Sequence, residues 1–410
     1  MVVKQRRQKI NTEGSDTMEK ILFECDYGEG AHPKILERMT ETNMEQTPGY
    51  GEDEHCRNAA AKIRALCENE NAEVHFLVGG TQTNMTVISS ILRPYQGVIA
   101  ADTGHVSVHE TGAIESTGHK VISVPGKDGK ITAEQIRAVC EEHWADSSHE
   151  HIVQPGMVYI SFPTEVGTLY SEKELLRISS VCREFRLPLF IDGARLGYGL
   201  ASEKNDITLP RLASLCDVFY IGGTKVGALF GEAVVFTNTS LTRDFRYMIK
   251  QKGGMLAKGR LLGIQFETLL EDNLYFELAA HADRLAMKLR SALAEKGYPF
   301  MVESWTNQQF PILPLEKLEQ LSGRFGFSFW GKTDETHAAV RFCTSWATKE
   351  EHVDALIAAL WLISVAFPAV KGECGGRKKR QEPSGGSGNV RGIGLLSAAY
   401  AGAQTENRLF

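Results

Sequence analysis

The chain has 410 residues, of which 42% are hydrophobic and 23% charged, and its formal net charge is −6. This composition is typical of a globular protein with a large and a smaller domain, and the acidic balance gives no indication of a nucleic-acid partner. No apolar run reaches the roughly 20 residues that span a bilayer, and the basic N-terminus lacks an apolar secretory segment, so we expect a cytoplasmic protein with no membrane partner.

Both ends of the chain are predicted to be disordered tails. Residues 1–17 are polar and unpatterned, and residues 371–410 begin with a basic, Gly/Ser-rich stretch that cannot bury enough apolar surface to fold alone. Between the tails we place an N-terminal segment and large domain at 18–258, followed by a linking helix and small C-terminal domain at 259–370.

Short apolar runs alternate with helical patterns through the large domain. Strands are predicted at 74–78, 97–101, 120–124, 157–161, 188–192, 217–222 and 232–236, and helices at 84–92, 132–143 and 171–185. This alternation predicts an α/β fold whose mostly parallel sheet is covered by helices on both faces. A long helical pattern at 259–296 and a mixed α+β segment at 300–360 follow.

The cysteines are scattered, and none forms a C-x-x-C pair. Reduced thiols are therefore expected, with neither a disulfide framework nor a metal site. They are Cys25, Cys56, Cys67, Cys140, Cys182, Cys216, Cys343 and Cys374.

An aspartate and a lysine are predicted at the carboxyl edge of the sheet, where open α/β folds bind ligands. Asp192 ends the apolar run PLFID, and Lys225 follows the run DVFYIG within GGTKVG. Pyridoxal 5′-phosphate (PLP) needs this pair, because a lysine forms the Schiff base and a carboxylate keeps the pyridine nitrogen protonated. Alone, Asp192 is as well explained as a helix cap and Lys225 as a solvated loop residue.

A phosphate cup is predicted at the same edge, between a strand and a helix. Gly80 and Thr81 lie in GGTQ, where backbone N–H groups and a helix N-terminus offer an anion site, and Thr224 beside Lys225 is placed with them. Other phosphate motifs fail on spacing: GGTKVG lacks a P-loop Gly-Lys-Ser/Thr, and Ser202 stands where a dinucleotide motif needs glycine.

Three further side chains are candidates for ring and carboxylate binding. His105 follows the run VIAA and could stack on a flat cofactor, or be a histidine at a helix start. Arg195 and Arg341 are candidate carboxylate binders, because a guanidinium grips a carboxylate through two parallel hydrogen bonds. Arg341 lies in the apolar run AVRFC, which predicts either a ligand or a buried acidic partner.

With these residues assembled, the sequence resembles the low-specificity threonine aldolase and aromatic amino acid β-eliminating lyase family, over roughly residues 23–360. The resemblance rests on Cys25-Asp26, Tyr50-Gly51-Glu52-Asp53, Gly80-Thr81, Ala101-Asp102 with His105, Glu110-Thr111-Gly112-Ala113, Asp192-Gly193-Ala194-Arg195, Lys225 and Arg341.

The resemblance implies the aspartate aminotransferase fold of PLP-dependent transferases, a PLP cofactor and an amino-acid substrate. It implies that Gly80 and Thr81 hold the phosphate, His105 stacks on the ring, and Arg195 and Arg341 take the substrate carboxylate. It also implies a homodimer or homotetramer with active sites shared between subunits.

The chain departs from the family pattern at three places. Cys25 stands where the family has serine, which puts a contact to the substrate carboxylate in doubt. Glu165 replaces a histidine that touches the substrate hydroxyl, and it is either a base or a helix-start or surface glutamate. The segment 253–259 lacks the family arginine, for which Lys258 or Arg260 is a substitute.

The sequence favours a lyase that cleaves a β-hydroxy-α-amino acid, threonine-like, into glycine and an aldehyde. In this hypothesis Lys225, Asp192, His105 and Glu165 are catalytic. The alternatives are a PLP enzyme for β-elimination or racemisation, and a non-catalytic binding homologue, against which the presence of both Lys225 and Asp192 argues.

Overall fold

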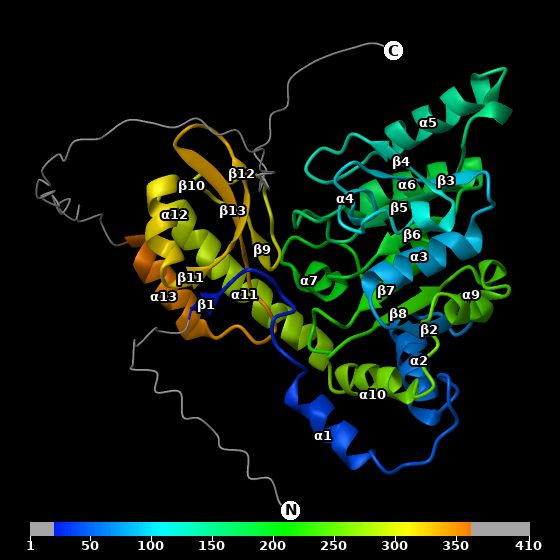
Figure 1. Ribbon diagram of the computed structural model, residues 1–410, viewed down its shortest axis with the longest axis horizontal. Coiled ribbons are helices and arrows are strands. Elements are labelled where there is room, and N and C mark those ends of the chain that lie inside the picture. Colours follow the sequence, from blue (N-terminus) through cyan, green and yellow to red (C-terminus); the bar gives the residue numbers. More distant parts are fainter. Residues whose placement is uncertain (1–19, 362–410) are drawn as a thin grey trace, which may run out of the picture. The chain divides into compact units, whose positions relative to one another are not determined.

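A seven-stranded sheet forms the centre of the computed structural model, which describes residues 20–361 (Figure 1). The strand order is β2-β8-β7-β6-β5-β3-β4, and β8 alone runs antiparallel to its neighbours β2 and β7. Each strand lies within three residues of a predicted one: β2 (Glu73–Leu77), β3 (Gln96–Ala101), β4 (Lys120–Val124), β5 (Gln154–Ser161), β6 (Leu189–Asp192), β7 (Val218–Gly222) and β8 (Glu232–Phe236). The predicted α/β class with a mostly parallel sheet is confirmed.

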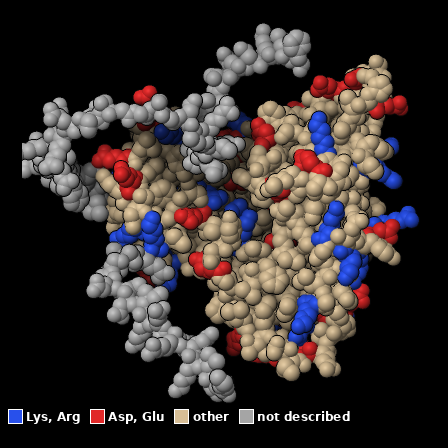
Figure 2. All heavy atoms as spheres, viewed as in Figure 1, with Lys and Arg blue, Asp and Glu red and all other residues tan. Residues whose placement is uncertain are grey.

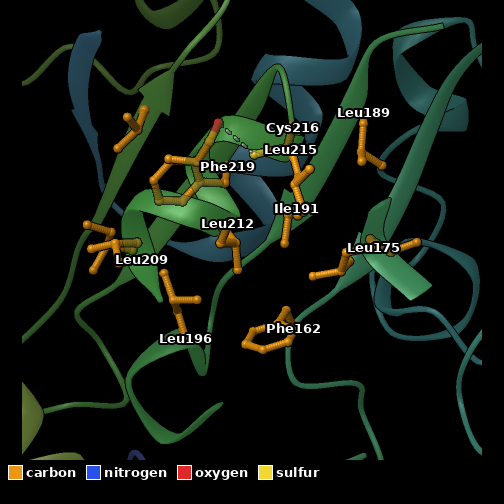
Figure 3. Close-up of a cluster of buried hydrophobic side chains, with 14 of the residues drawn as sticks. Phe162, Leu175, Leu189, Ile191, Leu196, Leu209, Leu212, Leu215, Cys216 and Phe219 are labelled. Carbon is orange, nitrogen blue, oxygen red and sulfur yellow. Dashed lines mark hydrogen bonds between the residues drawn. The ribbon is translucent and has the colours of Figure 1, made fainter. Parts of the chain in front are cut away.

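Alternate residues of the central strands enter hydrophobic clusters on opposite faces of the sheet. On one face, Phe219 and Ile221 pack with α2 (Glu54–Leu66), α5 (Ala133–Ala145), α6 (Glu172–Phe185), α8 (Leu209–Leu215) and α10 (Arg260–Leu269). On the other, Val218 and Tyr220 pack with α3 (Gly80–Ile91), α4 (His105–Val108) and α9 (Phe245–Gln251). Figure 3 shows part of the first cluster, where Leu212 of α8 lies near Ile191 and Phe219. Both faces of the sheet are thus covered, as predicted.

The helices begin at residues that sequence patterns mark. At the start of α6, the Ser171 hydroxyl accepts from the backbone N–H of Glu174, whose carboxylate accepts from the backbone N–H of Ser171. Thr132 and Gln135 form the same reciprocal cap on α5. Such caps satisfy backbone donors that the first helical turn leaves unpaired.

The structure divides the predicted helix at 259–296 into α10 and α11 (Leu274–Glu295). Asp272 and Asn273 have φ angles of 47° and 63°, and this left-handed backbone ends one helix and starts the next in a new direction. The helix predicted at 84–92 begins earlier, at Gly80, so the predicted phosphate turn forms its first turn.

A smaller layer is built on α11, which Figure 1 shows running from α10 toward α12 and α13. The second sheet has the order β10-β13-β12, with β9 also paired to β13, and β1 pairs with β11. Its elements are β9 (Gln308–Gln309), β10 (Ile312–Pro314), β12 (Ser328–Lys332), β13 (His337–Cys343), α12 (Leu315–Ser322) and α13 (Glu350–Trp361), with β1 (Ile21–Leu22) and β11 (Phe325–Gly326).

The remaining elements are short: α1 (Pro33–Glu41), α7 (Leu196–Ala201) and the 3-10 turns Glu115–Thr117, His149–His151 and Thr239–Leu241. The predicted division between 18–258 and 259–370 stays a prediction. The predicted tails, 1–17 and 371–410, lie outside the described residues.

Asp283 of α11 is a buried carboxyl group in the centre of the fold. Burial raises its pKa well above the usual value, and neither of its carboxyl oxygens has a hydrogen-bond partner within the described residues. A group whose pKa is raised by folding contributes most to stability below its unfolded pKa, and this contribution is lost as pH rises through the folded pKa.

We therefore expect Asp283→Asn to stabilise the protein at alkaline pH. An amide keeps the volume and removes the cost of protonating this carboxyl group on folding, so the free energy of unfolding should rise by roughly 1–3 kcal/mol at about pH 8 and change little at about pH 5. Urea unfolding at both pH values measures this. A variant that is less stable at the higher pH would contradict the assignment of a neutral Asp283.

Candidate active site

Asp192 ends β6 at the carboxyl edge of the sheet, where its carboxylate is buried. It accepts hydrogen bonds from the hydroxyls of Tyr159 and Tyr220, both at 2.5 Å, from the side chain of Asn84 at 3.1 Å, and from the backbone N–H of Ala194 at 2.9 Å. Burial alone would raise the pKa of Asp192, but the nearby His105 and the hydroxyl donors outweigh burial and lower it. The group is therefore held ionised inside the protein.

Lys225 follows β7 and lines the same cavity as Asp192. The cavity has a volume of about 330 Å³, and Gly80, Thr81 and Thr224 also line it. Burial lowers the pKa of Lys225, assisted by the charge of Arg195 and opposed by the neighbouring carboxylates. A lysine with a lowered pKa is a better nucleophile near neutral pH, because more of it is the free amine.

The N-terminus of α3 faces this cavity without a side-chain cap. Gly79 is the N-cap residue, and a Cβ placed on it would meet no atom within 4 Å. The first backbone N–H groups of a helix have no partner in the helix and suit a phosphate. The observed cavity therefore has a lysine, an ionised carboxylate and an uncapped helix end, which fits PLP.

His105 starts α4 at the rim of the cavity. Its Nδ1 lies 2.8 Å from Oε1 of Glu110, a carboxylate whose side chain is fully buried. Burial would lower the pKa of His105, but the hydrogen bond to Glu110 and the charge of Asp192 outweigh it and raise the pKa. The imidazole is thereby held in one orientation, with Nε2 left for other contacts.

Glu165 also lines the cavity, and its Oε1 accepts from the backbone N–H of His105 at 2.9 Å and from the hydroxyl of Ser161 at 2.6 Å. Burial raises the pKa of Glu165 despite these donors. The surface position that the sequence left open for Glu165 is therefore not what the structure has. A carboxylate with a raised pKa is a better base near neutral pH.

Arg195, the residue before α7, is bound to a buried carboxylate. Its Nε and Nη2 donate to the two oxygens of Asp26 at 2.7 and 3.0 Å, and Asn307 donates to Asp26 at 2.9 Å. Burial would raise the pKa of Asp26, but Arg195 outweighs it and lowers the pKa. The guanidinium fork that the sequence assigned to a substrate carboxylate is thus directed at Asp26.

Arg341 of β13 lies in a neighbouring cavity of about 350 Å³, which His105, Glu165 and Lys225 also line. It donates to Oε1 of Gln308 at 3.1 Å and to the carbonyl of Glu24 at 2.7 Å. Among residues 20–361 no carboxylate forms an ion pair with it. The acidic partner that was one of the two explanations for this arginine is therefore absent from the described structure.

Two predicted residues have other surroundings. Cys25 is a half-exposed free thiol and lines neither cavity. Thr224 lines the cavity of Lys225, but its Oγ1 lies 2.8 Å from Oε1 of Glu232, a partner that the sequence did not indicate. Every cysteine within the described residues is a free thiol, and Cys374 lies outside them.

Sequence reasoning assigned no role to several residues that complete the site. Tyr159 and Tyr220 lie in the mostly apolar strands β5 and β7, on the face of the sheet that carries Asp192. A tyrosine hydroxyl in a buried strand, on the same face of the sheet as Asp192, was the sequence feature that could have indicated these two donors. Glu232, the first residue of β8, lines the cavity at the edge where its antiparallel strand begins.

No helix within residues 20–361 is long and apolar enough to cross a membrane, and no cluster of three or more His, Cys, Asp or Glu side chains there has a metal-binding arrangement. On the face of the molecule that Figure 2 shows, the basic and acidic side chains of the described residues are interspersed.

The model of the beta-eliminating lyase family matches residues 26–314. The chain belongs to this family. It is similar to the low specificity L-threonine aldolase of Pseudomonas sp. (strain NCIMB 10558), with 34% identity over 339 residues, 82% of this chain and 96% of the relative. The enzyme of the same name from Pseudomonas aeruginosa is 33% identical over 83% of this chain and 97% of its own length. The resemblance inferred from the sequence is confirmed.

Solved structures agree with this membership. Leishmania major threonine aldolase has a TM-score of 0.81 and 47% identity, and the match covers 83% of this chain and 98% of that chain. An aspartate aminotransferase double mutant from Thermus thermophilus has a TM-score of 0.61 and 15% identity, covering 85% of this chain and 97% of that chain, which speaks for the fold alone. The predicted aspartate aminotransferase fold is confirmed.

The contrast between the two arginines predicts different effects of removing each. Arg195→Ala leaves a buried Asp26 without its ionic partner, which should lower the free energy of unfolding by about 3–5 kcal/mol. Arg341→Ala should leave stability nearly unchanged and weaken amino-acid binding by about 2–5 kcal/mol. Urea unfolding and ligand titration of both variants measure the two effects. Unfolding of Arg341→Ala at much lower urea with unchanged ligand affinity would show that its role is structural.

Proposed function

We propose that this chain is a PLP-dependent carbon–carbon lyase that cleaves a threonine-like β-hydroxy-α-amino acid into glycine and an aldehyde. The observation that carries the proposal is one cavity that holds Lys225, an ionised Asp192 and the uncapped N-terminus of α3. The names of its relatives at 33–34% identity support the same reaction.

The residues of the cavity divide among the parts of the cofactor. Lys225 is the amine that carries it, Gly80, Thr81 and Thr224 hold its phosphate, Asp192 pairs with the ring nitrogen, and His105 lies against the ring. When bound, PLP supplies an aldehyde for the substrate amine and a ring that accepts the electron pair left at Cα. An ionised Asp192 suits this role because it keeps the nitrogen protonated.

Arg341 receives the substrate carboxylate. Cys25 is assigned to the same carboxylate site, because it directly follows Glu24, whose carbonyl accepts a hydrogen bond from Arg341. Of the two candidate arginines, Arg341 forms no ion pair with a carboxylate of residues 20–361, whereas Arg195 holds Asp26. Arg195 then acts on the substrate through its positive charge and through the position of Asp26. The resemblance implied that both arginines take the substrate carboxylate; in this proposal Arg341 binds it directly and Arg195 does not.

Glu165 removes the proton of the substrate hydroxyl as the Cα–Cβ bond breaks. Its Oε1 accepts from the backbone N–H of His105 and the hydroxyl of Ser161, and its side chain lines the cavity in which the substrate would bind. The two hydrogen bonds to Oε1 hold the carboxyl group of Glu165 in place while it gains and loses the proton.

The proposal extends to assembly and location. We infer a homodimer or homotetramer with shared active sites, acting in the cytoplasm on a small amino-acid substrate. The large domain at 18–258 then carries the cofactor residues, and the small domain at 259–370 carries Arg341.

The cofactor assignment predicts a covalent label on one lysine. Borohydride reduction of the PLP-loaded protein should place the chromophore on the peptide that contains Lys225, and Lys225→Ala should lose turnover while still binding PLP through Gly80 and Thr81. Peptide mapping by mass spectrometry measures the label. A label on another lysine, or none, would refute the central assignment.

The base assignment predicts that Glu165→Gln lowers aldehyde release by roughly 10²–10⁴-fold, as expected for a lost general base. Exchange of the glycine Cα proton does not need the hydroxyl base and should continue. Because burial raises the pKa of Glu165, wild-type aldehyde release should increase as pH rises through that pKa.

Ser161→Ala provides a matched variant for the same prediction. It removes a donor that stabilises the ionised carboxylate, so the acidic limb of the rate profile should move to higher pH. Equal aldehyde release by wild type and Glu165→Gln would exclude Glu165 as the base. Little aldehyde release by wild type, with pyruvate, ammonia or racemised amino acid instead, would favour the alternative reactions.

A further inference from the structure

Glu232 is a buried carboxyl group that the proposed reaction does not use. It opens β8, is 3% exposed, and lines the cavity of Lys225. In the antiparallel pair of β7 and β8 it stands opposite Gly222, and Gly222 lies three residues before Lys225 in the chain. An acid at this position needs an explanation, because a phosphate group nearby would repel its ionised form.

Glu232 forms hydrogen bonds with Thr224, the residue next to Lys225, and with the backbone of Gly223. Oε1 of Glu232 lies 2.8 Å from Oγ1 of Thr224, and Oε2 accepts from the backbone N–H of Gly223 at 3.2 Å. The same Thr224 oxygen accepts from the backbone N–H of Gly231 at 3.0 Å. Thr224 therefore has one hydroxyl proton, which it can direct toward Glu232, toward the carbonyl of Gly231 at the longer distance of 3.5 Å, or into the cavity.

The protonation state of Glu232 decides which direction the hydroxyl takes. An ionised Glu232 can only accept, so Thr224 must donate to it and presents a lone pair to the cavity. A protonated Glu232 donates to Thr224 instead, and the Thr224 hydroxyl is then free to donate to an anion held with Gly80 and Thr81.

We propose that Glu232 is a positioning residue that carries a proton and thereby turns the hydroxyl of Thr224 toward the phosphate of the cofactor. The inference rests on the proposed PLP function and adds a pH-dependent element to the phosphate cup. Glu232 acts through Thr224 and not on the substrate.

The electrostatic surroundings support a neutral Glu232 near neutral pH. Burial raises the pKa of Glu232 to about 8, the charge of Asp192 acts in the same direction, and the Thr224 donor and Lys225 oppose it. The other titratable groups close enough to interact are Tyr220 of β7 and Tyr275 of α11. Burial raises the pKa of both tyrosines well above that of Glu232, so they stay neutral while it titrates.

The test compares pyridoxamine 5′-phosphate with pyridoxamine, neither of which can form a covalent bond to Lys225. Their ratio of dissociation constants isolates the phosphate, which is already dianionic above about pH 7 because its second pKa is about 6. For wild type we expect the advantage of the phosphorylated ligand to fall about tenfold between about pH 7 and about pH 9, as one hydrogen bond to a charged group is lost.

Three variants separate the explanations. Glu232→Gln keeps a permanent donor toward Thr224 and should retain the full advantage at both pH values. Thr224→Val has no hydroxyl and should show the reduced advantage already at the lower pH. Glu165→Gln removes a different acid from the same cavity without touching Thr224, and should keep the wild-type pH dependence.

Two results would overturn the inference while leaving the cofactor assignment in place. One is the same pH dependence in wild type and Glu232→Gln. The other is an equal loss of affinity for both ligands in Glu232→Gln, which would make Glu232 a counter-ion of Lys225. Failure of both ligands to bind, with Lys225 unlabelled after borohydride, would instead overturn the proposed function itself.

Discussion

The close contact between the chain leaving β6 and the end of β7 is the constraint on which the site depends. A Cβ at Gly193 would lie 1.8 Å from a backbone carbonyl oxygen of β7, and one at Gly222 would lie 2.3 Å from a backbone carbonyl oxygen in the turn after β6. The backbone N–H of Gly222 donates to the carbonyl of Gly193 at 2.9 Å. Because Asp192 directly precedes one glycine and Lys225 follows the other, this contact holds the carboxylate and the amine at one edge. Any side chain at either position would force the two strand ends apart.

Features that are local in sequence could be predicted, because a buried strand is a short apolar run and its last residue marks the edge of the sheet. The strands at 120–124 and 232–236 have the predicted bounds, and Asp192 and Lys225 line one cavity. The start of α3 was placed late, since glycines followed by threonine are equally typical of a turn. The break between α10 and α11 was missed because left-handed backbone at Asn273 is common for asparagine in loops but has no apolar signature.

The partners of the charged side chains could not be predicted, because they come from distant parts of the chain. Arg195 and Asp26 are 169 positions apart, and Arg341 is 317 positions from Glu24, to whose carbonyl it donates. Guanidinium groups look alike in sequence whether they bind a ligand or a buried carboxylate. Only the folded chain, which brings Asp26 to Arg195 and the carbonyl of Glu24 to Arg341, separates one role from the other.

The site also depends on three carboxyl groups that line one cavity and have different pKa values. Environments that separate the pKa values of similar groups let a protein provide both acids and bases at one pH. Asp192 has four donors and a lowered pKa, whereas Glu165 and Glu232 have two hydrogen-bond contacts each in the described structure and raised pKa values. A phosphate and a substrate carboxylate both add negative charge to this cavity. Since like charges in a buried site are costly, binding them should raise the pKa of both glutamates further, so the ionised Glu165 that accepts the hydroxyl proton should form at higher pH. The ionised Asp192, held by donors from three separate strands and helices, would then be the acid that keeps its charge throughout.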